Sequence, residues 1–173
     1  MEVATAAVDA NRMMNQVNVR VMEAEDGPAV LRIYEKGMET RNATFETSAP
    51  TWEEWNRNHL AHGRFVAVID EQVVGWAALS AYSKRAVYRG VAEVSVYIDP
   101  AVTGKAIGSK LMDCIIHEAK ERGFWMLQSG IFPENEASMA LHKKFGFREV
   151  GYREKIGQLD GIWRDVVLFE KRF

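Results

Sequence analysis

The feature of this sequence that most constrains its fold is a strand, a glycine-containing loop and a long helix in direct succession. Residues 91–98 have the mixed apolar pattern of a strand, which Asp99-Pro100 ends. The segment 106–122 carries an apolar residue at every fourth position, on one helical stripe: Ile107, Leu111, Ile115 and Ala119. Gly123 then ends this helix. The succession predicts a domain in which strands and helices interleave.

The rest of the chain continues this alternation. The patterns predict further strands over 17–21, 64–70, 73–82, 124–131, 148–155 and 162–171, with a turn at Glu71-Gln72. Further helices are predicted from Asp26-Gly27-Pro28, from the capping-box spacing Thr51-Trp52-Glu53-Glu54, and over 135–145. No repeat or linker interrupts the pattern. We therefore expect a flexible N-terminal extension over residues 1–16 and one α/β domain over residues 17–173.

Composition excludes several classes of protein. A chain of 173 residues fits one domain, and 22 basic against 24 acidic residues argue against a general nucleic-acid binder. The single cysteine, Cys114, cannot form an internal disulfide. The longest largely apolar stretch, 72–83, is too short to span a bilayer, and the N-terminus lacks a signal-peptide pattern. We expect a cytoplasmic protein with no membrane or nucleic-acid partner.

The loop 103–109 combines Gly104, Lys105 and Gly108 at the start of the long helix. A helix N-terminus presents free backbone N–H groups and favours negative charge, so this loop predicts a site for a phosphorylated ligand. The spacing does not fit a P-loop, because Ala106 follows Lys105, and it does not fit the dinucleotide fingerprint. An ordinary strand-to-helix turn remains the alternative.

Three further groups of residues are candidates for chemistry. Glu93 lies in an otherwise apolar strand, where its neighbours predict burial and a role as a general base, although strand glutamates more often face solvent. Arg85 and Arg89 form either a clamp for a carboxylate or a solvated basic loop. His59 and His62 have no acidic or cysteine partner at ligand spacing, so no metal site is expected.

Several spaced motifs resemble the GNAT superfamily of N-acetyltransferases. They are Glu93 to Pro100, the loop Thr103–Gly108, and Asn135…Leu141-His142…Phe145-Gly146-Phe147. Other motifs resemble the branch that acetylates phosphinothricin, methionine sulfoximine and methionine sulfone: Ile33-Tyr34, Ala43-Thr44-Phe45, Tyr88-Arg89, Glu93-x-Ser95-Val96-Tyr97 and Gly161-x-Trp163-x-Asp165. The resemblance covers residues 17–171. It implies a central mixed, mostly antiparallel sheet flanked by helices.

The resemblance also implies an activity and its partners. The implied enzyme uses acetyl-CoA, without a metal, to acetylate the α-amino group of a small amino-acid analogue by direct transfer in a ternary complex. A homodimer with its active site near the subunit contact is implied as well. The implied coenzyme-binding residues are Val96, Tyr97, Ile98, Gly104, Lys105, Ala106, Ile107, Gly108, Ser109 and Asn135.

Glu93 is the implied general base, acting directly or through water. The implied substrate-binding residues are Ser83, Lys84, Arg85, Glu93, Val94 and Ser95. The chain departs from the family pattern at Thr103, where the family usually has Arg or Gln, at Ala106, where it usually has Gly, and at His142, where many members have a tyrosine acid. A thiol with a pKa near ~8.5 leaves as a thiolate with little help, so an acid is not required. Acetylation of a protein N-terminus or a polyamine, and a silent acyl-CoA sensor, are the alternatives.

Overall fold

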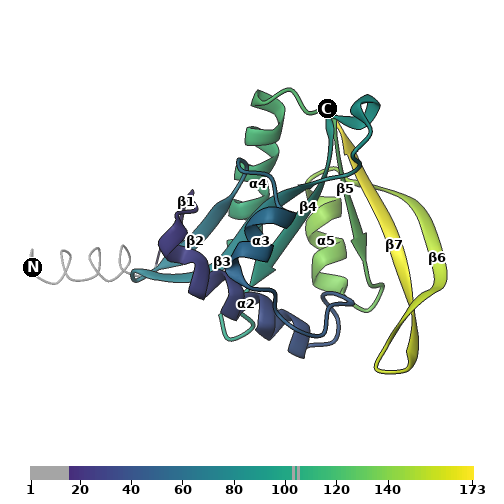
Figure 1. The fold of residues 1–173 in the computed structure, drawn as a ribbon, viewed down its shortest axis with the longest axis horizontal. Coiled ribbons are helices and arrows are strands. Elements are labelled where there is room, and N and C mark those ends of the chain that lie inside the picture. Colours follow the sequence, from purple (N-terminus) through teal and green to yellow (C-terminus); the bar gives the residue numbers. More distant parts are fainter. Residues whose placement is uncertain (1–15, 103, 105) are drawn as a thin grey trace, which may run out of the picture.

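The computed structural model describes residues 16–102, 104 and 106–173, and its centre is a seven-stranded sheet (Figure 1). The strand order is β1-β2-β3-β4-β5-β7-β6. The strands are β1 (Asn18–Val21), β2 (Phe65–Ile69), β3 (Gln72–Ala81), β4 (Val91–Ile98), β5 (Met126–Ile131), β6 (Arg148–Leu159) and β7 (Ile162–Arg172). The pair β4–β5 is parallel and the other neighbouring pairs are antiparallel, which confirms the expected mixed, mostly antiparallel sheet.

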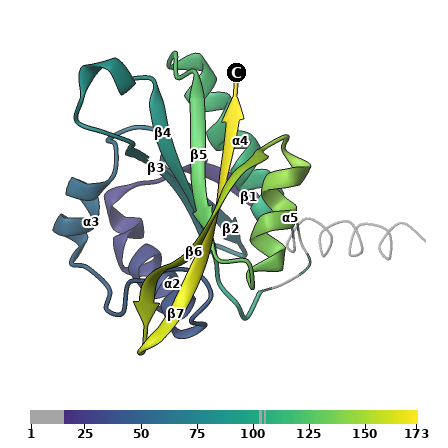
Figure 2. The ribbon, with the colours of Figure 1, turned by 90° about the vertical axis from the view of Figure 1, so that its right-hand side faces the viewer.

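Helices cover both faces of the sheet, α2 and α3 on one and α4 and α5 on the other (Figure 2). They are α2 (Gly27–Glu39), α3 (Trp52–Asn58), α4 (Ile107–Glu121) and α5 (Glu136–Lys144), with short 3-10 turns η1 (Ala24–Asp26) and η2 (Ala86–Tyr88). The predicted capping box starts α3: Glu54 N donates to Thr51 Oγ1 at 3.2 Å, and Thr51 N donates to Glu54 Oε2 at 2.9 Å. In the part of the chain that the structure describes, no helix has the length and apolar character to cross a membrane.

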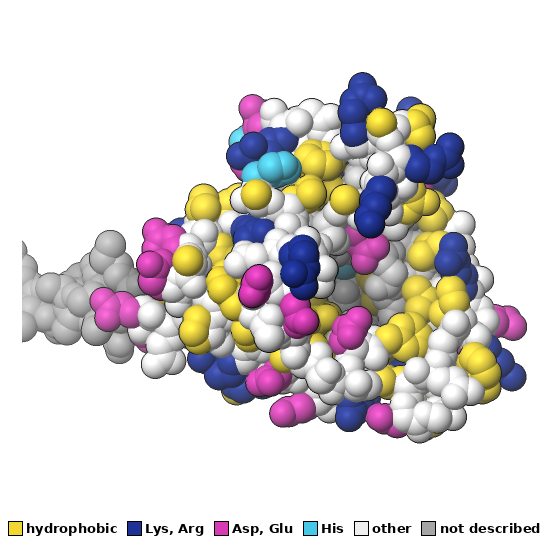
Figure 3. Space-filling model, viewed as in Figure 1, with side chains coloured by type: hydrophobic (Ala, Val, Ile, Leu, Met, Phe, Trp, Pro, Cys, Tyr) yellow, Lys and Arg dark blue, Asp and Glu magenta, His cyan; other side chains and the backbone are white. Residues whose placement is uncertain are grey.

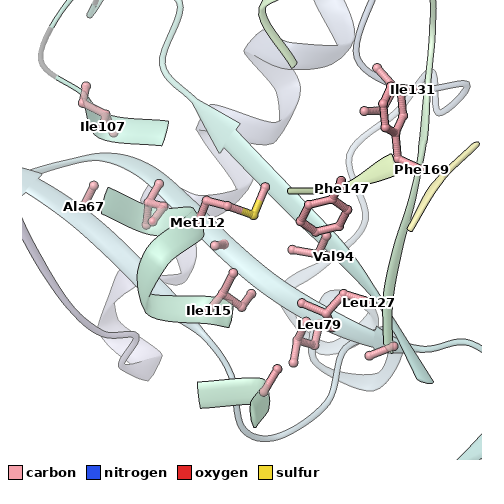
Figure 4. Packing of buried hydrophobic residues seen from close by; sticks show 14 of the residues in the cluster. Ala67, Leu79, Val94, Ile107, Met112, Ile115, Leu127, Ile131, Phe147 and Phe169 are labelled. Carbon is pink, nitrogen blue, oxygen red and sulfur yellow. The ribbon is translucent and has the colours of Figure 1, made fainter. Parts of the chain in front are cut away.

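The core is divided by the alternation of side chains along the central strands. On β3, Ala77 and Leu79 face the large cluster beneath α4, whereas Trp76 and Ala78 face a second cluster beneath α2 and α3. The predicted stripe of α4 is buried in the large cluster, and Figure 4 shows Met112 and Ile115 of this helix among the side chains of the sheet. Each fully buried side chain of this kind stabilises the fold by about 1.5–3 kcal/mol.

Several predicted boundaries are wrong, among them the start of β5, which lies at Met126 and not at residue 124. The β2–β3 turn is formed by Asp70 and Glu71, since Ile69 pairs with Gln72; both turn residues have positive φ, 47° and 65°. Such a turn matches the right-handed twist of the flanking strands, and only the pairing register reveals it. Strand β6 does not end at Lys155 but continues to Leu159: its pairing with β7 shifts register between Arg153 and Gly157 and then resumes up to Leu159.

Candidate active site

The sheet opens between its two central strands immediately after Glu93. Parallel pairing joins Val91–Glu93 to Met126–Gln128; beyond it β4 stays paired with β3, and β5 stays paired with β7. Val91 O accepts a hydrogen bond from Tyr82 N on the β3 side, so odd-numbered residues of β4 direct their backbone groups toward β3. The backbone groups of Val94, Val96 and Ile98 therefore face the opening.

A cavity of about 720 Å³ lies at this opening. In Figure 3 the surface is hollowed between α3 and the β6–β7 hairpin, with acidic side chains beside the hollow. Its walls come from α2, the loop 43–50, α3, β3, β4, β5, α5 and β7. Three lining residues are carboxylates, Glu46, Glu54 and Glu93, and none of the described lining residues is Lys or Arg. The cavity therefore favours a cationic group such as an ammonium.

Glu93 reaches this cavity because it is exposed, which corrects the expectation of burial. Its apolar neighbours Ala92 and Val94 are buried, but they point to the opposite face of the sheet. On its own face Glu93 lies in register between Ser80 of β3 and Gln128 of β5. Gln128 Nε2 lies 3.5 Å from Glu93 Oε2.

His142 of α5 forms part of the cavity floor and is almost fully buried. Its Nδ1 lies 2.7 Å from Ser138 O and its Nε2 lies 2.9 Å from Ser129 Oγ, which is also 3.0 Å from Val94 O. Burial lowers the pKa of His142, and the contact with Ser138 only partly opposes this. In a neutral ring with its proton on Nδ1, the Nδ1–H donates a hydrogen bond to the carbonyl oxygen of Ser138, so His142 has no free N–H to offer as an acid.

The loop at the start of α4 has an open side and a packed side. Gly104 has a φ of 76° and would have nothing within 4 Å of an added Cβ. Gly108 was expected to admit a phosphate, but an added Cβ there would meet Ile98 Cδ1 at 3.1 Å and Leu141 Cδ2 at 3.2 Å. Core packing therefore accounts for the glycine at 108. Thr103 and Lys105 lie outside the described residues.

Ala106, the residue before α4, has φ 54° and ψ 30°, in the left-handed region. A side chain in this region costs about 1–2 kcal/mol, which explains why glycine is the usual family residue here. Ile107 is buried, whereas Ser109 is half-buried. Lys144 Nζ, from the end of α5, donates to Ser109 Oγ at 2.8 Å and so adds a cation to this helix start.

Aromatic packing and a helix cap hold the remaining predicted residues of the cavity wall. The Tyr97 ring stacks on Trp76, with centroids 4.8 Å apart, and burial raises the pKa of its phenol. Asn135 caps α5, since its Oδ1 accepts from Ser138 N at 3.2 Å, and its Nδ2 donates to Asn42 O at 3.2 Å. The cap thereby ties α5 to the loop that follows α2.

The predicted site residues fall into three places. Those that line the cavity are Glu93, Val94, Ser95, Val96, Tyr97 and Asn135. Ile98, Gly104 and Ala106–Ser109 follow along the same edge toward α4. Ser83, Lys84 and Arg85 are not among the residues that line the cavity: they lie on the loop after β3, where the Arg85 guanidinium packs over the Tyr88 ring at 5.4 Å.

Sequence reasoning missed several polar residues beside the cavity or the α4 start. They are Glu46, Ser80, Gln128, Ser129 and Lys144. None of them belongs to a local sequence pattern that indicates a binding or catalytic site. Each is brought to the cavity or to the start of α4 by strand pairing or helix packing. Among the described residues, no group of three or more His, Cys, Asp or Glu side chains could hold a metal ion.

Comparison with curated proteins finds relatives along most of the chain. It is 30% identical to the phosphinothricin N-acetyltransferase of Alcaligenes faecalis, over 88% of this chain and 81% of that protein. It is 25% identical to the L-methionine sulfoximine/L-methionine sulfone acetyltransferase of Pseudomonas aeruginosa, over 88% of this chain and 92% of that protein. Both relatives are acetyltransferases.

Solved structures share the fold. The ribosomal-protein-alanine N-acetyltransferase of Brucella melitensis has a TM-score of 0.84 at 33% identity, covering 90% of this chain and 99% of that one. A GNAT superfamily phosphinothricin acetyltransferase from Sinorhizobium meliloti, in complex with AcCoA, has a TM-score of 0.83 at 26% identity, covering 91% and 89%. The model of the acetyltransferase (GNAT) family matches residues 28–147. The chain therefore belongs to the GNAT family and is an N-acetyltransferase.

Proposed function

We propose that this acetyltransferase uses acetyl-CoA to acetylate the α-amino group of a small amino-acid analogue of the methionine sulfoximine, methionine sulfone or phosphinothricin type. The acetyl group passes directly to the amine within a ternary complex. The observation that carries the proposal is the position of Glu93, a carboxylate that lines the cavity where β4 and β5 part. The activities named for the relatives from Alcaligenes faecalis and Pseudomonas aeruginosa support the substrate class.

The residues along this edge fit acetyl-CoA. Val96 and Ile98 direct backbone groups into the opening, where an extended pantetheine chain pairs as an added strand would. Gly104 leaves space for a phosphate, and the α4 N-terminus with Lys144 supplies N–H groups and a cation for the pyrophosphate. The coenzyme supplies the acetyl group as an activated thioester.

Glu93 takes the proton from the substrate ammonium, directly or through a water molecule. An α-amino group has a pKa of about 7.7–8.0, so a modest base is sufficient near neutral pH. The carboxylates Glu46 and Glu54 attract the ammonium into the same cavity. The acid is not supplied by His142, because both ring nitrogens contact protein groups.

The loop carrying Ser83, Lys84 and Arg85 binds the substrate carboxylate at the rim of the cavity. Arginine offers paired donors that match a carboxylate, and this loop directly follows the strand that supplies Ser80 to the cavity. The proposed enzyme is a cytoplasmic homodimer, with the rim near the subunit contact, and its reaction detoxifies such amino-acid analogues.

Replacing the base tests this proposal. Glu93→Gln keeps the size of the side chain but cannot take up the proton, and we expect a rate lower by about 100- to 10,000-fold at neutral pH. Acetyl-CoA affinity, measured by calorimetry, is expected to stay unchanged, and the acidic limb of the pH–rate profile is expected to disappear. A variant within about threefold of wild type, with its acidic limb intact, would contradict the role of Glu93.

A second candidate is an acceptor without a carboxylate, such as a protein N-terminus or a polyamine. The acidic lining of the cavity favours it, as does the likeness to a ribosomal-protein-alanine N-acetyltransferase. Rates on methionine sulfone, its carboxamide and spermidine separate the two candidates. The amino-acid proposal requires the free acid to be the best substrate by about tenfold or more, since hydrogen bonds to a charged group contribute about 1.5–3 kcal/mol.

A further inference from the structure

Glu93 is one member of a polar row that crosses three strands. Strand pairing places Ser80 of β3 and Gln128 of β5 directly opposite Glu93, one on each side. Residues opposite one another on neighbouring strands project from the same face, so the three side chains stand together. Ser80 lines the cavity with Glu93, and Gln128 flanks Glu93 on the β5 side, at the last pair before the two strands part.

The contact within this row joins Gln128 to the carboxylate. Gln128 Nε2 lies 3.5 Å from Glu93 Oε2, a long hydrogen bond of the kind that catalytic groups show before substrate binds. An amide donor favours the charged carboxylate without adding a charge to the cavity. With Oε2 held toward β5, the other carboxylate oxygen remains available to the cavity.

We propose that Gln128 is a positioning residue for the acetyltransferase reaction: its amide holds one oxygen of Glu93 so that the other accepts the substrate proton. This inference rests on the proposed function of Glu93. An exposed carboxylate on a strand otherwise samples several rotamers, and a base must lie within hydrogen-bond reach of its proton. Gln128 restricts that freedom at the point where the cavity begins.

Other titratable groups share the cavity and set the electrostatic background. They are Glu46, Glu54, His59 and His142, with the phenols of Tyr34 and Tyr97. Glu46 belongs to the loop after α2, Glu54 to the first turn of α3, and His59 directly follows α3. His142 belongs to α5, Tyr34 to α2 and Tyr97 to β4. Gln128 differs from all of them in standing directly beside Glu93 on a paired strand. On its other side Gln128 lies opposite Glu170 of β7, whose carboxylate forms an ion pair with Arg148. A new charge at 128 therefore acts on both Glu93 and Glu170, and of these two carboxylates Glu93 is the one that lines the cavity.

The experiment compares three substitutions at this position with a matched control. Gln128→Leu removes the donor, Gln128→Glu adds a like charge, and Gln128→Lys adds an opposite charge. The control is Gln72→Leu, the same exchange at an exposed position eight residues before Ser80 on β3, about 26 Å along the strand. Each variant is assayed for kcat, for the KM of both substrates, for acetyl-CoA affinity by calorimetry, and for the pH–rate profile.

We expect Gln128→Leu to lower kcat by about 10- to 100-fold, the effect of a small misplacement of a catalytic group, with acetyl-CoA affinity unchanged. The acidic limb is expected to move to higher pH in Gln128→Glu and to lower pH in Gln128→Lys, because a like charge disfavours a carboxylate and an opposite charge favours it. Gln72→Leu is expected to leave all four quantities unchanged. A general loss of structure cannot shift the acidic limb of the pH–rate profile to higher pH in one variant and to lower pH in the other.

A double substitution separates this inference from the proposed function. In a Glu93→Gln background, Gln128→Leu is expected to cause no further loss of kcat, because Gln128 then has no base to position. If Glu93→Gln is inactive while the Gln128 variants keep the kcat and acidic limb of wild type, the positioning role of Gln128 is refuted and the base remains. If Glu93→Gln is fully active, the proposed function fails first, whatever the Gln128 variants do.

Discussion

Lys144 Nζ at the C-terminal end of α5 donates a hydrogen bond to Ser109 Oγ in the first turn of α4, at 2.8 Å. The two residues are 35 positions apart in the chain, and their contact brings a cation to a helix N-terminus that already favours anions. The proposed pyrophosphate site is thus built from two helices rather than from the loop alone.

Lys144→Ala is therefore expected to weaken acetyl-CoA binding by about fivefold, as the loss of one exposed charge contact of ~1 kcal/mol would. The affinity is measured by calorimetry at low and high salt, and the difference from wild type is expected to shrink as salt is added. Lys143→Ala is the matched control, an exposed lysine at the same helix end. Equal losses in the two variants would mean that only the overall charge matters.

Ala106→Gly is expected to stabilise the protein. Glycine avoids the cost of about 1–2 kcal/mol that alanine has in the left-handed region at φ 54°. The greater entropy of glycine in the unfolded chain offsets about half of this gain. The net gain of about 0.5–1 kcal/mol corresponds to a Tm higher by about 1–4 °C. Ala101→Gly, at an exposed position of the preceding turn, serves as the control and is expected to lower the Tm slightly. A lower Tm for Ala106→Gly would contradict the assigned strain.

Gly108→Ala is expected to destabilise the protein by about 0.5–2 kcal/mol: the added methyl meets Ile98 and Leu141 at 3.1–3.2 Å, and the better helix propensity of alanine offsets only part of this overpacking. Gly151→Ala is the control, since the nearest atom to its added methyl is Leu168 Cδ1 at 3.9 Å. Chemical denaturation of both variants measures the difference. If Gly108→Ala were as stable as wild type, core packing would not account for the glycine, and the expectation that it admits a phosphate would stand.

The stability of the protein is expected to fall as the pH is lowered below about 6.5, in part because of His142. Burial lowers the pKa of His142 in the folded state, so the unfolded chain takes up the proton first. The stabilising contribution of this histidine is complete above the unfolded pKa and decreases as the pH falls below it. His142→Asn is expected to flatten the dependence of Tm on pH between 7 and 5, whereas His117→Asn, at an exposed position of α4, leaves the slope of wild type. An unchanged slope in His142→Asn would assign the effect to His59 and His62, which are half-buried and whose pKa values are also lowered by desolvation.

Local signals in the sequence were sufficient for most elements of the fold. The capping box of Thr51 and Glu54 starts α3, Pro28 lies in the first turn of α2, and the stripe that begins at Ile107 is the buried face of α4. These signals depend on hydrogen bonds and side-chain spacing within a few residues, so they can be recognised without knowledge of the rest of the structure. The predicted mixed sheet followed from the family resemblance and is confirmed by the strand pairing.

Only the tertiary structure decided which residues meet. Glu93 could be read from the sequence as an unusual strand carboxylate, but its exposure and its place between Ser80 and Gln128 depend on strand order and register. The contact of Lys144 with Ser109 depends in the same way on how two helices pack. Neighbours across a sheet or between helices are selected by the packing of the whole core, which leaves no local pattern at the residues concerned.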